Sequence, residues 1–248
     1  MKKIMMLLIA AVMLFGVSGQ AMAYFADGDL IQVVYQNGGT SEVATDLGAF
    51  SPTTAYTGNT VNLTSNPIPF TGTGAFAGVS ASSLDVAYYI TTGGSAPTNI
   101  WISGPQAGQT ALSRQNAAIQ TLPTINNNYA SVGTAQVTLL QSNPLSYYAV
   151  EDKGGTTPGG FDGFINNPAM YGEQNLGNLS TLGYVDSYLY YYSAPKNGGN
   201  GVQVATIRTF ADGTSEILGG APTPIPASIL LLGSGLAGLV GIRRKQLV

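Results

Sequence analysis

Short runs of β-branched and aromatic residues, each followed by residues that favour turns, recur along the middle of this chain. The clearest runs are LIQVVYQ (30–36), LDVAYYIT (84–91), NIWIS (99–103), YVDSYLYYYS (184–193) and VQVATIRTF (202–210). The Asn, Gly and Pro residues between them supply the backbone angles that tight turns need. This spacing predicts an all-β, mainly antiparallel domain of the β-sandwich or jelly-roll type.

Weaker segments complete the expected domain. Residues 40–46, 135–140, 146–150 and 215–218 also read as strands. Residues 113–122 are the best helix candidate, ended by Pro123, because proline lacks a backbone donor. We therefore expect at most one or two short helices.

The first residues have the pattern of a secretory signal peptide. Lys2 and Lys3 precede an apolar stretch, and Ala21 and Ala23 place small residues where a signal peptidase binds them. The apolar stretch is about 14 residues, shorter than the roughly 20 of a stable membrane span. We expect cleavage before Tyr24, leaving residues 1–23 behind. An uncleaved N-terminal anchor is the alternative.

The last residues have three parts in a fixed order. Pro224, Ile225, Pro226 and Ala227 precede an apolar segment, ASILLLGSGLAGLVGI, which the cations Arg243, Arg244 and Lys245 follow directly. As a helix the segment reaches about 24 Å, a short transmembrane span whose basic end stays cytoplasmic. The alternative is a buried core helix. The chain then divides into a signal peptide (1–23), a β-rich extracytoplasmic domain (24–220) and a tail (221–248).

This tail resembles the PEP-CTERM sorting tail of Gram-negative bacteria. The resemblance rests on the proline motif at 224–227, the glycine-studded segment LLLGSGLAGLVG and the terminal basic cluster, with Ile225 in place of the acidic residue of the family name. It implies recognition and cleavage by an exosortase, passage through the inner membrane, and a final place at the cell surface, outer membrane or extracellular matrix. Proteins with such tails are associated with exopolysaccharide and biofilm.

Charge and composition exclude several classes of function. The segment between the two ends carries all 12 acidic residues but only four of the 9 basic ones, so its net charge is −8. Such a surface disfavours nucleic acid, whose binding depends on cations that neutralise phosphates. The chain has no cysteine and no histidine, which excludes disulfides, Ser-His-Asp catalysis and His-ligated metal sites.

Two acidic groups are candidate calcium ligands, since Ca²⁺ takes six to eight oxygens. They are Asp27 with Asp29, and Glu151 with Asp152 near Asp162. The second group could also supply the paired carboxylates of a glycoside hydrolase. In both, solvated acids beside turns are the simpler interpretation, so no cofactor is expected.

Tyrosines in residues 184–193 are the most distinctive pattern. Alternation places Tyr188, Tyr190 and Tyr192 on one face of a strand and Tyr191 on the other. Three rings in a row could stack against sugar rings, or could form a half-buried sheet face. The sequence as a whole favours a non-enzymatic structural or interaction protein of the cell surface or matrix. A carbohydrate-binding module and a carboxylate-dependent glycoside hydrolase are the alternatives.

Overall fold

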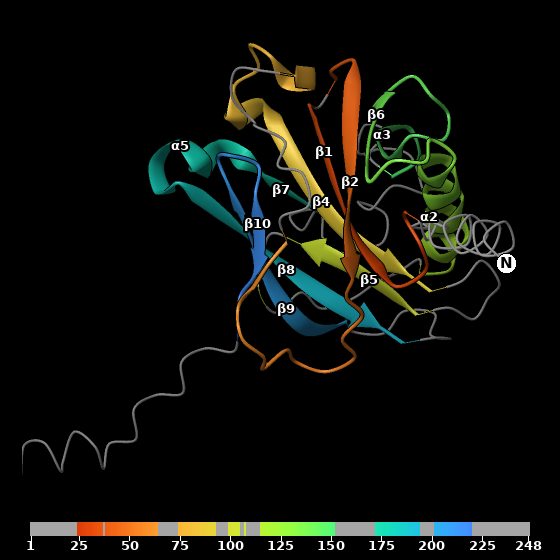
Figure 1. Ribbon diagram of the computed structural model, residues 1–248, viewed down its shortest axis with the longest axis vertical. Coiled ribbons are helices and arrows are strands. Elements are labelled where there is room, and N and C mark those ends of the chain that lie inside the picture. Colours follow the sequence, from red (N-terminus) through yellow and green to blue (C-terminus); the bar gives the residue numbers. More distant parts are fainter. Residues whose placement is uncertain are drawn as a thin grey trace, which may run out of the picture.

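The fold is mainly antiparallel β-structure (Figure 1). The computed structural model describes residues 24–36, 38–63, 74–92, 99–104, 107, 115–151, 172–193 and 201–219. The ten strands are β1 (Asp29–Gln36), β2 (Ser41–Ala49), β3 (Val61–Asn62), β4 (Leu84–Thr91), β5 (Ile100–Gly104), β6 (Gln136–Leu140), β7 (Glu173–Asn175), β8 (Tyr184–Tyr192), β9 (Val202–Phe210) and β10 (Ser215–Ile217).

All ten strands belong to one sheet rather than to the two sheets of a sandwich. Nine of them lie in the order β3-β10-β9-β8-β5-β4-β1-β2-β6, and the tenth, β7, pairs with β4. Every pairing among the described strands is antiparallel. Apart from residues 146–150, the strands predicted from local pattern, including the β1–β2 and β8–β9 pairs, are confirmed.

One edge of β4 is shared by two strands. β7 pairs with Asp85–Ala87 and β5 pairs with Tyr89–Thr91, which leaves the backbone of Tyr88 between them. The Tyr88 N–H donates instead to Oγ of Ser103, 2.8 Å away. A buried amide therefore keeps a partner at the junction.

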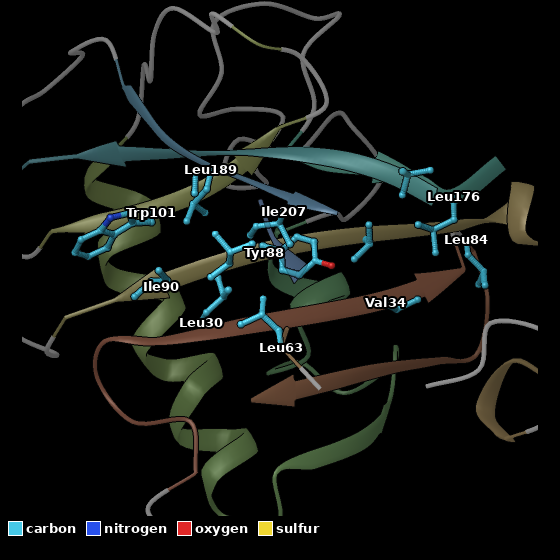
Figure 2. Packing of buried hydrophobic residues seen from close by; sticks show 14 of the residues in the cluster. Leu30, Val34, Leu63, Leu84, Tyr88, Ile90, Trp101, Leu176, Leu189 and Ile207 are labelled. Atoms are coloured by element: carbon cyan, nitrogen blue, oxygen red, sulfur yellow. The ribbon is translucent and has the colours of Figure 1, made fainter. Parts of the chain in front are cut away.

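The sheet curls until strands distant in its order face each other. β4 and β9 are separated by β5 and β8, yet the hydroxyl of Tyr88 on β4 lies 2.6 Å from Oγ1 of Thr209 on β9. Apolar side chains from both ends of the sheet fill the space inside the curl (Figure 2). We call them the interior cluster, which includes Leu30, Val34, Leu84, Tyr88, Ile90, Trp101, Leu189, Ile207 and Ile217.

A second core lies on the other face of the same strands. Helix α2 (Gln115–Ala130) and helix α3 (Tyr147–Glu151) lie on one side of the sheet (Figure 1). The helix-side cluster includes Phe25, Ile31, Val33, Tyr35, Tyr89, Ile102, Leu122, Ile125, Tyr129, Tyr147, Tyr190 and Tyr192. Both faces of β1, β4 and β5 are consequently buried, which explains their nearly continuous apolar sequences.

Helical structure exceeds the expectation from sequence. Besides α2 and α3 there is α5 (Leu179–Leu182), with 3₁₀ turns η1 (Gly74–Phe76), η2 (Ala81–Ser83) and η3 (Leu176–Asn178). The prediction that Pro123 ends a helix was wrong, because α2 continues through it. The packing of Leu122, Ile125 and Tyr129 against the sheet outweighs the missing hydrogen bond.

The predicted strand at residues 146–150 was also wrong, since this segment forms α3. Its first two amides, of Tyr147 and Tyr148, donate to the carboxylate of Glu42 on β2. A long-range partner thus satisfies the free N–H groups that a helical turn leaves at its start.

Candidate functional site

Two carboxyl groups hold the residues just before β1. Asp46 Oδ2 accepts the N–H of Phe25 at 2.6 Å, and Asp29 Oδ2 accepts the N–H of Ala26 at 2.8 Å. Asp46 Oδ1 also accepts the N–H of Gly48 at 2.8 Å. Asp29 and Asp46 are only 9% and 6% exposed, so both are acids largely withdrawn from water.

Phe25 is the residue that this pair positions. Its φ of 58° lies in the left-handed region, which costs energy for a residue with a bulky side chain. Its ring is 3% exposed and packs 5.2 Å from the ring of Tyr129 on α2. Burial of the ring and the bond to Asp46 together offset the backbone strain.

The carboxyl pair has an altered acidity. Burial, followed by the charge of Asp46, raises the pKa of Asp29 from 3.8 to about 6. The bond from the Ala26 amide opposes this shift, while a hydrogen bond between the two carboxyl groups and the charge of Asp27 add to it. Asp29 therefore takes up a proton in mildly acidic solution.

The structure brings Asp29 together with a partner that the sequence did not indicate. Asp27 and Asp29 were candidate calcium ligands, but the oxygens of Asp29 and Asp46 face backbone amides. No group of three or more acidic side chains that could hold a metal occurs within the described ranges. Asp46 was missed because acids in an alternating strand are expected to point to solvent, whereas both faces of β2 are covered.

Glu42 lies on the same face of β2 and is fully buried. Its Oε1 accepts the Tyr129 hydroxyl at 2.6 Å and the Tyr147 N–H at 2.9 Å, and its Oε2 accepts the Tyr148 N–H at 2.8 Å. Burial raises its pKa, and these three bonds partly counter the shift. The carboxylate fastens α2 and α3 to the sheet, and its burial keeps substrates away from it.

Tyrosines extend this network across the helix-side cluster. The Tyr147 hydroxyl donates to Oε1 of Glu173 at 2.8 Å, and the Tyr147 ring stacks on Tyr89 with centroids 5.9 Å apart. The Tyr89 hydroxyl donates in turn to Oδ1 of Asn126 at 2.7 Å. Two buried glutamates are thus bridged by one tyrosine in a structural network.

The tyrosine platform is contradicted by burial. Tyr188, Tyr190 and Tyr192 do share a face, as alternation predicted. That face is the one that the helix-side cluster covers, and Tyr190 and Tyr192 are 1% and 4% exposed. Rings without an exposed face cannot stack on a sugar, so Tyr190 and Tyr192 are core residues, and Tyr188 is half-buried beside them.

The remaining sequence candidates are described in part or not at all. Glu151 is the last residue of α3. Ala21, Ala23, Asp152, Asp162 and the sorting-signal residues Pro224, Ile225, Pro226, Ala227, Arg243, Arg244 and Lys245 lie outside the described residues. Within the part that the structure describes, no helix is long and apolar enough to cross a membrane.

One open pocket of about 270 Å³ lies where β9 and β10 meet the segment after β2. It is lined by Ala55, Tyr56, Gln203, Val204, Ala205, Thr206, Leu218 and Gly219, all uncharged. Val204 and Ala205 are consecutive yet both buried, because the β8–β9 register shifts there. A charged ligand would find no ionic partner among these residues.

Comparison with known proteins gives no match: no family model, no curated protein and no solved structure is similar to this chain.

Proposed function

We propose that this chain is an exported structural or interaction protein of the cell surface or extracellular matrix, processed at both ends. Signal peptidase removes residues 1–23, and an exosortase recognises the tail and cleaves near the motif at 224–227. In this proposal the tail is a substrate for another enzyme, and the β-domain is the part that remains.

The observation that carries the proposal is the pattern of the two ends of the sequence: small residues at Ala21 and Ala23 after an apolar stretch, and a proline motif, apolar segment and basic cluster over residues 224–245. Among the described residues, the first buried hydrophobic one is Phe25, one position after the expected new N-terminus Tyr24, and its amide is held by Asp46. At the other end, the Gly219 N–H donates to Oγ1 of Thr60 at 3.1 Å, just before the proline-containing stretch. The buried hydrophobic residues that the structure describes run from Phe25 to Ile217.

The acidic residues of the described part of the domain support a non-catalytic role for that part. Glu42, Asp29 and Asp46 are buried and accept backbone or tyrosine donors. Asp186 is used in a bidentate pair with Arg208 across β8 and β9. These carboxylates stabilise the fold rather than face a substrate.

Intact mass and cell fractionation of the protein from its host test the proposal. We expect a species that starts at Tyr24, ends between Pro222 and Pro226, and lies outside the inner membrane. Changing Pro224 and Pro226 to Ala should leave an uncut chain in that membrane, whereas Pro144→Ala, in an exposed turn, should not. A wild-type species that keeps residues 227–248 in the inner membrane would show a simple C-terminal anchor and overturn the exosortase step.

A further inference from the structure

Residues 24–29, which we call the latch segment, join three strands at one end of the sheet. Besides the bonds to Asp46 and Asp29, the Gly28 N–H donates to the Thr91 carbonyl on β4 at 2.9 Å. The carbonyl of Gly28 accepts the Phe50 N–H, just after β2, at 3.0 Å. Release of this segment would uncover the Phe25 ring and loosen the ends of β2 and β4.

The charged and titratable groups around the latch segment come from few elements. The segment itself supplies Tyr24, Asp27 and Asp29, and β2 supplies Asp46. Helix α2 contributes Tyr129, whose ring packs on Phe25 and whose hydroxyl donates to Glu42. β4 contacts the segment through the backbone of Thr91. Asp27, Asp29 and Asp46 are all carboxyls, so a proton shared by Asp29 and Asp46 reduces the repulsion among them.

We propose that Asp29 and Asp46 form a proton-operated latch, which holds residues 24–29 against the core when the pair carries one proton and loosens them when that proton leaves. With the proton, Asp29 donates to Asp46, and each carboxyl still accepts its backbone amide. Without it, two negative charges are held close together in a site with little water, which favours the open segment.

The direction of the pH effect on latch closure follows from the difference between the pKa of Asp29 in the open and in the closed segment. The pKa of Asp29 is 3.8 in an open chain and about 6 in the closed one. Protonation therefore favours closure, fully below pH 3.8, and this contribution is lost as the pH rises through 6. Between pH 5 and pH 7.5 the closing equilibrium should weaken about tenfold.

Amide hydrogen exchange in the full chain tests the latch, with rates corrected for the intrinsic effect of pH. We expect the amides of Phe25 and Ala26 to be about tenfold more protected at pH 5 than at pH 7.5. Amides in β8 and β9 report opening of the whole domain at each pH, so they show whether a change at Phe25 and Ala26 is local. Equal protection of Phe25 and Ala26 at the two pH values in the wild type would overturn the proposal without any variant.

Two substitutions sharpen the test. Asp29→Asn mimics the protonated carboxyl, so in this variant the amides of Phe25 and Ala26 should be equally protected from exchange at pH 5 and pH 7.5. Asp212→Asn is the matched control, because Asp212 holds a turn through Thr214 and should leave the wild-type pH dependence intact. Persistence of the tenfold difference in Asp29→Asn would show that another group titrates and would refute the assignment.

Discussion

The hydroxyl of Tyr88 on β4 lies 2.6 Å from Oγ1 of Thr209 on β9, although 121 residues separate them. The same hydroxyl lies 2.8 Å from Oγ of Ser215 and accepts from Nε2 of Gln32 at 2.9 Å. These four side chains are buried in the middle of the interior cluster. One phenol group therefore connects β1 and β4 to β9 and β10 across the inside of the curled sheet.

Tyr88→Phe should lower the free energy of unfolding by about 1–3 kcal/mol, because the buried groups of Gln32, Thr209 and Ser215 lose a partner that water cannot replace. Tyr56→Phe is the matched control, since the Tyr56 hydroxyl bonds the Asn59 carbonyl at an exposed position. Urea unfolding of both variants decides the point. Equal, small losses would mean that closure of the sheet does not depend on this hydroxyl.

Tyr190→Ala should destabilise the domain by about 3–5 kcal/mol, the usual cost of removing a large aromatic side chain from a core. Tyr188→Ala, at a half-buried position on the same face, should cost clearly less. Thermal unfolding of the two variants measures the difference. Unchanged stability in Tyr190→Ala, together with loss of retention on a polysaccharide, would instead restore the platform hypothesis.

These tyrosines show which structural features the local sequence can predict and which it cannot. Alternation in β8 correctly placed Tyr188, Tyr190 and Tyr192 on one face, because the period of a strand is a local property. Whether that face meets water depends on α2 and α3, which come from elsewhere in the chain. The same limit applies to α3, whose helical turn starts on the distant carboxylate of Glu42. Pairing of Asp29 with Asp46 likewise requires the β1–β2 register, which no local pattern supplies.

Pro123→Ala should stabilise the domain by about 1–2 kcal/mol. Pro123 lies inside α2, where a proline costs about 3 kcal/mol relative to alanine through its missing hydrogen bond and its steric clash. Part of this gain is lost because alanine leaves the unfolded chain more conformational freedom than proline does. Pro144→Ala, in an exposed turn, should not stabilise. Denaturant unfolding of both variants provides the comparison, and a loss of stability in Pro123→Ala would show that the proline ring itself is needed in the packing.

Tyr129→Phe should be more costly in alkaline than in acidic solution. The Tyr129 hydroxyl donates to Glu42 and favours its charged form, so its removal raises the pKa of Glu42 further. We expect a loss of about 1–3 kcal/mol at pH 8, and a smaller loss at pH 4, which lies below the raised pKa of Glu42. Urea unfolding at the two pH values measures both, and a loss independent of pH would contradict this account of Glu42.

The raised pKa of Glu42 also determines how its contribution to the free energy of unfolding changes with pH in the wild type. Because burial raises this pKa above 4.5, stability from Glu42 is fully present below pH 4.5 and is lost as the pH rises through the raised value. Burial raises the pKa of Asp85 in the same direction. The free energy of unfolding should therefore increase as the pH falls through the raised pKa of Glu42 toward 4.5, and a decrease over that range would contradict the assignment.

Cleavage before Tyr24 should itself alter the acidity of Asp29. It would create an α-ammonium group, with an ordinary pKa of about 8, one residue from the Phe25 amide that donates to Asp46. A cation there favours ionised carboxyls, so the pKa of Asp29 should fall below about 6 and the mature chain should keep more stability at pH 7. The measurement is an NMR titration of Asp29 in a chain that starts at Tyr24 and in one that retains Ala23. Because the second chain adds only Ala23, which moves its ammonium group one residue further from Phe25, identical titration curves would show that the new N-terminus does not affect the carboxyl pair.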